Sequence, residues 1–326
     1  DPGRSPARRP GPPASRRGPS RRHAAVPYLY IAPFFVVFGC FGLFPLLFTG
    51  YLSLHTVDLV DLGRREWVGP TNFTTLWQDG QFHNAVLNTF TIGVLSTVPQ
   101  LLMALGIAHL LNLGMRGRTL VRVAVLVPYA TSVAAASLVF AQLFGRDHGL
   151  INWLLSSAGA SPVDWEPGRW SSQIAIAVII TWRWTGYNAL IYLAGMQSVP
   201  ADLYEAAAID GANRWQQFLH VTVPSLRPAI IFTVINSTIG ALQVFGEPRL
   251  FGNPGAGGIA GGASNQYQTI GLLLYQQGWS FGQLGVASAT ACSMFAIIIV
   301  VATVNGLLVT GRLSQLTRVL RVGRDT

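Results

Sequence analysis

Residues 85–111 read AVLNTFTIGVLSTVPQLLMALGIAHLL. A helix needs about 20 consecutive apolar residues to cross the hydrocarbon of a bilayer, and this stretch is long enough. It is hydrophobic throughout rather than alternating between apolar and polar residues, which favours a helix over a strand of a membrane barrel. A helix also satisfies its own backbone hydrogen bonds in the absence of water. The stretch therefore predicts a transmembrane helix.

Five further stretches of similar length and composition lie on either side of it. They cover residues 28–54, 119–144, 173–197, 226–251 and 284–310. Together the six stretches predict an all-α polytopic membrane protein with six transmembrane helices. The composition agrees, because half of the 326 residues are hydrophobic and only 11% are charged, against about 25% in an average soluble domain.

The net charge of +9 is distributed unevenly along the chain, and all 22 basic residues are arginines. If the N-terminus is placed in the cytoplasm and the six helices alternate, sixteen arginines fall in cytoplasmic segments and four in external loops. Positive charge concentrates on the cytoplasmic side of membrane proteins. The distribution therefore predicts that both termini are cytoplasmic, and it accounts for the charge without a nucleic-acid partner.

The two ends of the chain differ from the apolar region between them. Residues 1–27 are rich in Pro, Gly, Ser and Arg, which predicts a disordered basic cytoplasmic tail. Residues 28–310 form the predicted membrane domain, and residues 311–326 a short cytoplasmic tail. The two cysteines and six histidines form no cluster with metal-ligand spacing, so neither a metal site nor a disulfide is expected.

The polar segment 199–228, VPADLYEAAAIDGANRWQQFLHVTVPSLRP, lies on the arginine-rich side between the fourth and fifth apolar stretches. We expect a short helix that starts near Pro200 and ends at Gly211, followed by a second helix that ends before Pro224. Small residues beside aromatic ones suggest a docking surface for another protein. A loop helix that merely caps the bundle is the alternative, and the pattern alone leaves both open.

Within this segment the run Glu205-Ala206-Ala207, followed by Asp210-Gly211, Phe218 and Pro224, closely resembles the EAA loop of ABC-importer permeases. The resemblance extends over about residues 28–310. The lead-in 199–204 is similar to that of members of the maltose/multiple-sugar, or carbohydrate uptake, type. The resemblance implies a type I ABC importer permease in the bacterial plasma membrane, a transport subunit and not an enzyme.

The resemblance also implies partners and roles. The loop would form a coupling helix on a cytoplasmic ABC ATPase dimer, which would bind ATP and Mg, so that this chain needs no cofactor. A second six-helix permease subunit would complete a heterodimer, and an extracytoplasmic sugar-binding protein would deliver a di- or oligosaccharide. The residues implied in coupling are Glu205, Ala206, Ala207, Asp210, Gly211, Phe218 and Pro224.

Polar residues inside the apolar stretches are the candidates for substrate contact, because such residues usually face a cavity or a partner helix. Asn236, Gln243 and Glu247 recur at helical spacing in the fifth stretch and predict one polar face, with Phe245 near its outer end. In the fourth stretch, Tyr187 and Asn188 are further candidates. Amide, carboxylate and aromatic groups suit a sugar. The alternative is interhelical bonding, with Glu247 bound to Arg249 or Arg183.

Other functions remain open beside sugar import. A permease of this kind could carry another small polar solute, such as a polyol or a glycerol phosphate. A secondary carrier would be expected to place ionisable residues in several stretches, and only Glu247 fits. A polytopic membrane enzyme would need a catalytic constellation, and no convincing Ser/His/Asp or Cys/His set is found in the sequence.

Overall fold

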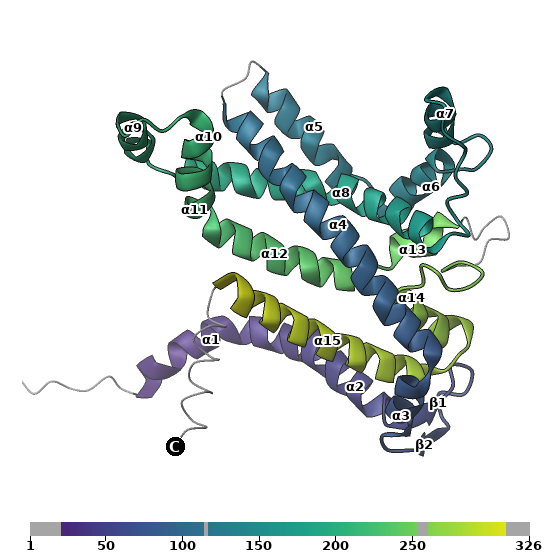
Figure 1. Cartoon of the computed structure of the whole chain (residues 1–326). Helices are drawn as coiled ribbons and strands as arrows, with labels where there is room; N and C mark the ends of the chain where they lie inside the picture. Colours follow the sequence, from purple (N-terminus) through teal and green to yellow (C-terminus); the bar gives the residue numbers. More distant parts are fainter. Residues whose placement is uncertain (1–20, 114–116, 253–259, 311–326) are drawn as a thin grey trace, which may run out of the picture. The chain divides into compact units, whose positions relative to one another are not determined.

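The computed structural model describes residues 21–113, 117–252 and 260–310, and these residues are mostly helical (Figure 1). They fall into two units, residues 1–49 and residues 50–326. Residues 1–20 and 311–326, expected to belong to the two tails, lie outside the described residues.

The first unit contains the N-terminal apolar helix. Its elements are α1 (Arg21–Phe38), a π-helical turn (Gly39–Leu43) and the start of α2 (Phe44–Leu52). The stretch Tyr30–Leu52 is long and apolar enough to cross a membrane. Because α1 begins at Arg21, residues 21–27 are helical, although the sequence places them in the disordered tail.

The second unit contains a small hairpin and the remaining helices. They are β1 (His55–Val57), β2 (Arg65–Trp67), α3 (Thr71–Gln78), α4 (Gly80–Asn112), α5 (Arg118–Ala130), α6 (Val133–Leu143), α7 (Leu150–Ser157), α8 (Arg169–Gln197), α9 (Ala201–Ile209), α10 (Arg214–Gln217), a π-helical turn (Phe218–Thr222), α11 (Val223–Ser225), α12 (Arg227–Leu242), α13 (Gly246–Phe251), α14 (Ile270–Tyr275), a second π-helical turn (Gln276–Ser280) and α15 (Leu284–Thr310). The two strands pair antiparallel, with His55 opposite Trp67.

Four helical stretches of the described residues are long and apolar enough to cross a membrane: Tyr30–Leu52, α4, α8 and Leu284–Leu308 of α15. Two further pairs of helices are each joined by a sharp bend, and the number of candidate spans rises to six if each pair is one span. α5 and α6 meet at 93°, and the segment Arg214–Ser225 meets α12 at 67°. The described residues therefore contain four to six candidate spans, and the predicted stretches 119–144 and 226–251 are not continuous helices.

The expectation of one helix over residues 119–144 is wrong. α5 ends at Ala130, and Thr131 is extended, with φ −71° and ψ 137°. Ser132 then caps α6, and its hydroxyl accepts from the backbone N–H of Ala135 at 3.3 Å. Pro128, one turn from the bend, has no N–H and weakens the last turn of α5. A serine cap gives the second helix its own start.

α4 and α8 form the centre of the second unit and run side by side (Figure 1). Small residues make this close packing possible, as is common between membrane helices. Ala104 and Ala108 of α4 pack in one buried cluster with Ala189 and Leu193 of α8. α8 also packs closely against α5. A Cβ at Gly186 of α8 would overlap the carbonyl oxygen of Val125 in α5, so only glycine fits there.

A polar network ties the other end of α4 to α8 and to the chain before α14. Arg169 donates to the side-chain oxygens of Asn84 and Asn88 at 2.9 and 2.8 Å. Asn88 in turn donates to the backbone oxygens of Asn265 and Gln268 at 2.8 and 3.0 Å. Asn265 is the described non-glycine residue with a positive φ, 54°. These bonds satisfy backbone groups of a segment that has no regular structure of its own.

Candidate functional site

The fifth apolar stretch is broken in its polar part. α12 ends at Leu242, and α13 begins at Gly246. Pro248 explains the break, because in a continuous helix its ring would clash with the carbonyl of Val244. That carbonyl instead accepts a hydrogen bond from the hydroxyl of Thr269 at 2.8 Å. The prediction of one continuous polar face is therefore wrong: Asn236 lies on α12, and Glu247 lies on α13.

A small cavity of about 20 Å³ lies beside this break. Its lining residues come from three helices and from the break itself: Thr97 and Gln100 of α4, Ile180 and Trp184 of α8, Ser237, Gly240 and Ala241 of α12, and Val244. A cavity of this size holds about one water molecule. The cavity therefore marks a point where polar side chains of α4 and α12 converge beside Trp184 of α8.

Ser237 is the centre of the hydrogen bonds at the cavity. Its hydroxyl oxygen accepts from Gln100 at 3.1 Å and from Asn188 at 3.2 Å. All three side chains are buried. The side-chain oxygen of Asn188 is also buried and has no hydrogen-bond partner among the described residues. An unpaired buried oxygen is costly, so this site retains one unused acceptor.

Three aromatic side chains adjoin the cavity through Trp184. Tyr187 stacks on Tyr129 of α5, with ring centroids 4.8 Å apart and planes at 19°. Trp184 meets both tyrosines edge to face, at 5.3 Å from Tyr129 and 6.0 Å from Tyr187. Tyr129 is 38% exposed, so the cluster is accessible in this chain. Aromatic faces beside amide groups suit the C–H faces and hydroxyls of a sugar.

Glu247 forms a buried ion pair with Arg183 of α8, at 2.8 Å. The structure thus shows the alternative considered for Glu247, an interhelical bond to Arg183 in place of a contact with substrate. The pair joins the short helix α13 to the long helix α8. Breaking such a pair leaves an uncompensated buried charge, so the pair holds α13 in place beside the cavity.

The remaining predicted substrate residues do not line the cavity. Gln243 is exposed at the end of α12, and Asn236 is half-buried with no side-chain hydrogen bond to a described residue. Phe245 is half-buried and contacts Tyr275 of α14, with ring centroids 5.2 Å apart. The structure therefore brings Tyr187 and Asn188 close to the cavity, and it places Phe245 against another helix.

Gln100, Thr97 and Ser237 were missed by the sequence reasoning. A signal was available for Gln100, because an amide in the middle of an apolar stretch is costly and has a reason to be there. Thr97 and Ser237 carried no such signal, because Ser and Thr commonly bond to their own helix or pack between helices. Only the packing of α4 against α12 brings these three side chains together.

The predicted coupling loop lies at the end of the second unit opposite α13 and α14 (Figure 1). α9 has no buried residue, and the side chains of Glu205, Ala206 and Asp210 are exposed. Ala207 is half-buried, and Pro224 is exposed on α11. The helix with the Glu-Ala-Ala run therefore projects from the unit and is open to a partner.

Gly211 ends α9 in the left-handed conformation, with φ +83°. The N–H of Ala212 donates to the oxygen of Ala207, and that of Gly211 to the oxygen of Ala208, which is the Schellman arrangement of a helix end. A Cβ at Gly211 would meet no atom of this chain within 4 Å. The turn therefore needs glycine for its backbone angle, not for space.

Phe218 fixes the loop to the bundle and is not part of its free surface. Its side chain is 7% exposed and lies 4.5 Å, centroid to centroid, from the ring of His109 in the last turn of α4. A hydrogen bond of 3.0 Å between the hydroxyls of Tyr204 and Thr222 joins α9 to the following turn. Asn213 and Gln216 cap α10 reciprocally. The loop is thus held in one position relative to α4.

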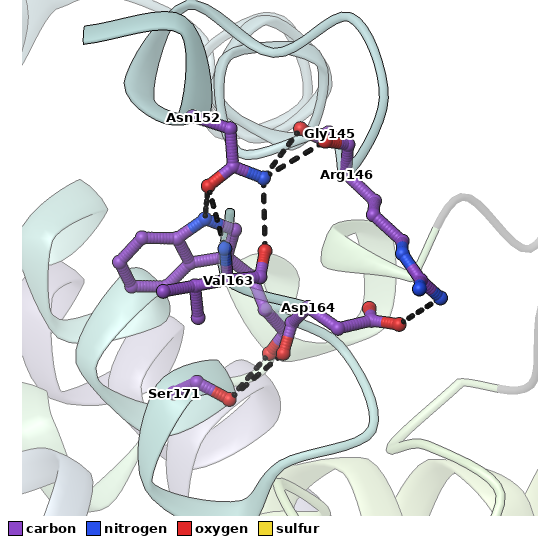
Figure 2. Close-up of polar contacts among 7 residues, drawn as sticks. Gly145, Arg146, Asn152, Val163, Asp164 and Ser171 are labelled. Carbon is purple, nitrogen blue, oxygen red and sulfur yellow. Dashed lines mark hydrogen bonds and ion pairs between the residues drawn. The ribbon is translucent and has the colours of Figure 1, made fainter. Parts of the chain in front are cut away.

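A compact loop connects α6 to α8 and centres on Asn152 of α7 (Figure 2). The Asn152 side chain donates to the oxygens of Arg146 and Val163 at 2.9 and 2.8 Å, and it accepts from the N–H of Val163 and the indole of Trp165. Arg146 also pairs with Asp164 at 2.8 Å on the surface. Burial raises the pKa of the nearby Glu166, and the charge of Asp164 raises it further.

The chain matches the family described as "Binding-protein-dependent transport system inner membrane component" over residues 100–313. It is 34% identical over 294 residues to the lactose transport system permease protein LacF of Rhizobium radiobacter, covering 89% of this chain and 95% of that protein. It is 32% identical to the trehalose/maltose transport system permease protein MalF of Thermococcus litoralis, covering 85% and 91%.

Two solved structures share the fold. A chain of a bacterial ABC transporter involved in the import of the acidic polysaccharide alginate superposes with a TM-score of 0.73, covering 89% of this chain and 96% of that chain at 22% identity. The same kind of transporter, in complex with an alginate pentasaccharide-bound periplasmic protein, gives a TM-score of 0.72, with 87% and 93% covered at 21% identity. At these identities the likeness concerns the fold alone.

Proposed function

This chain belongs to the family of binding-protein-dependent transport system inner membrane components, and we propose that it is a permease subunit of an ATP-driven importer for a di- or oligosaccharide. Its relatives are transport permeases and not enzymes, and several are named for the lactose, trehalose/maltose and arabinooligosaccharide systems. The family description and the apolar helices make it a membrane protein, and we place it in the bacterial plasma membrane.

The proposed topology has six spans and two cytoplasmic termini. Four stretches are long and apolar enough to span, and we assign the fifth and sixth spans to the bent pair α5–α6 and to α12, which follows the bend after Arg214–Ser225. The distribution of arginines supports this orientation. In this topology the loop at Glu205 is cytoplasmic, and the loop around Asn152 is external.

The loop from α9 to α11 is the proposed coupling element. Its exposed residues Glu205, Ala206 and Asp210, with Pro224, would contact a cytoplasmic ABC ATPase dimer that binds ATP and Mg. Trp215, 63% exposed, adds an apolar contact to this surface. Phe218 and Gly211 would act by holding the loop in shape. Because Phe218 packs on α4, a displacement of the loop would move α4 with it.

The proposed sugar contacts lie where α4, α8 and α12 converge. Asn188 and Tyr187, with Gln100 and Trp184, supply amide and aromatic groups at the cavity. The cavity is too small for a sugar, so the spans would separate for the cargo to pass. A second, similar subunit would form the other half of the path, in keeping with alternating access around a fixed site.

A sugar-binding protein is the proposed source of cargo at the external face. The support is the periplasmic protein present in the solved alginate transporter and the wording of the family description. A permease for a polyol or glycerol phosphate is the second candidate, because amide and hydroxyl groups at the cavity would suit those cargoes too.

One observation carries the proposal most directly: beside a broken span, Ser237 of α12 accepts hydrogen bonds from Gln100 of α4 and Asn188 of α8, next to Trp184. Uptake of a panel of labelled sugars, by a strain that lacks this chain and by the same strain complemented with it, tests the proposal. We expect uptake of at least one di- or oligosaccharide to depend on the chain. Equal uptake of every sugar by both strains would refute it.

A further inference from the structure

Arg249 on α13 lies against two aromatic rings. Its guanidinium carbon is 4.2 Å from the ring centroid of Tyr275 and 5.9 Å from that of Phe245. The side chain is half-buried. Within residues 21–113, 117–252 and 260–310, the guanidinium has no ion pair and no hydrogen bond. Its five N–H donors are therefore free of partners in the described part of the chain.

The nearest acidic residue along the chain cannot neutralise it. Glu247, two residues before Arg249, is engaged with Arg183 at 2.8 Å. Among the described residues, Arg249 thus has no carboxylate partner. A half-buried cation loses hydration, and aromatic rings compensate for this only in part. This corner of the molecule has the charge and the free donors to hold an anion.

The position of Arg249 connects this charge to the proposed path. α13 follows directly on the break at residues 243–245, and Val244 in that break lines the cavity. Phe245, in the same break, is one of the two rings that Arg249 contacts. Arg249 therefore contacts the break that contributes Val244 to the cavity.

We propose that Arg249 makes this permease select an acidic saccharide, with the carboxylate of a uronic-acid unit paired to its guanidinium. This inference rests on the proposed function. The planar fork of arginine matches a carboxylate in two parallel hydrogen bonds. The half-buried ring of Phe245 would offer an aromatic surface to the C–H face of the same sugar ring. A neutral sugar would satisfy the rings but leave the cation unpaired.

The test is equilibrium binding to the membrane complex, purified through a tag on this chain and placed in lipid nanodiscs without the external binding protein. The probes are labelled disaccharides with α- and β-1,4 links, each as the uronic acid and as its neutral C6 amide. We expect at least one acid to bind the wild type about tenfold more tightly than its amide. The preference should weaken as salt is raised.

Two variants separate this role from a structural one. Arg249→Gln should bring acid and amide to nearly equal affinity, and Arg249→Lys should retain part of the preference, because it keeps the charge but loses the fork. If the Arg249→Gln protein is not produced in a folded form, the test compares the acid-over-amide affinity ratio of the wild type with that of Arg249→Lys.

Two outcomes would overturn the inference. They are wild-type affinity that is no higher for any acid than for its amide, and an acid preference that survives undiminished in Arg249→Gln. These results would leave sugar import itself standing, which fails only if uptake does not depend on the chain.

Discussion

The guanidinium of Arg183 on α8 lies 2.8 Å from the carboxylate of Glu247 on α13, and both side chains are buried. The pair spans the break in the fifth apolar stretch and fixes the short helix that follows it. Glu247→Ala should destabilise the chain by about 3–5 kcal/mol, because it strands a buried arginine. Thermal unfolding of the purified protein in detergent measures this.

A charge exchange provides the control for that prediction. The double variant Arg183→Glu with Glu247→Arg restores opposite charges and should recover part of the lost stability, whereas Arg183→Glu alone should not. If the double variant were no more stable than either single one, the ion pair would not be the source of the effect.

The cavity residues should affect transport more than stability. Ser237→Ala removes the hydroxyl that accepts from Gln100 and Asn188 and should raise the apparent KM for sugar uptake several-fold. Thr91→Ala on α4 is a matched control, because its hydroxyl bonds only to the backbone of its own helix at Leu87. Equal uptake kinetics in Ser237→Ala and the control would remove Ser237 from the site.

Gly211→Ala should impair coupling through backbone strain. A left-handed residue with a Cβ costs about 1–2 kcal/mol, and Asn tolerates this conformation better. Gly211→Asn should therefore lose less transport than Gly211→Ala, relative to the wild type. Gly159→Ala is the control, because Gly159 has the same kind of conformation, φ +82°, and equally open surroundings outside the coupling loop. Loss of transport in both alanine variants to the same degree would contradict a specific role for the loop.

Phe218 and Trp215 should behave differently, although their rings are 5.5 Å apart. Phe218→Ala opens a cavity against α4 and should cost about 3–5 kcal/mol of stability. Trp215 is 63% exposed, so Trp215→Ala should leave stability unchanged and reduce sugar-stimulated ATP hydrolysis. A stable Phe218→Ala chain with normal coupling would show that the loop is not anchored by this contact.

The topology can be checked by cysteine labelling after replacement of Cys40 and Cys292. A cysteine at Trp215 should react with a membrane-impermeant maleimide only in inside-out vesicles, and one at Ser157 of α7 only in intact spheroplasts. The opposite pattern would invert the proposed orientation.

The apolar stretches were predictable because hydrocarbon thickness sets their length and leaves little choice of composition. The turn at Gly211 was predictable for a similar reason, since a glycine after a helical run is a common way to end a helix. Both features are local in the sequence.

The other features depend on neighbours that are distant in the sequence. The polar spacing of Asn236, Gln243 and Glu247 assumed a continuous helix, and the break at Pro248 removed that assumption. The pairing of Glu247 with Arg183 and the burial of Phe218 are set by packing against α8 and α4. The spacing of residues along the chain does not identify Arg183 as the partner of Glu247, nor α4 as the partner of Phe218.

The most direct test of ATP-driven import coupled through the loop is sugar accumulation in proteoliposomes that contain the complete complex, its binding protein and ATP on the cytoplasmic side. We expect the wild type to accumulate labelled sugar only with ATP. Glu205→Arg, which reverses an exposed charge on α9, should assemble normally and accumulate none. Accumulation without ATP, or at the wild-type rate in Glu205→Arg, would contradict the account.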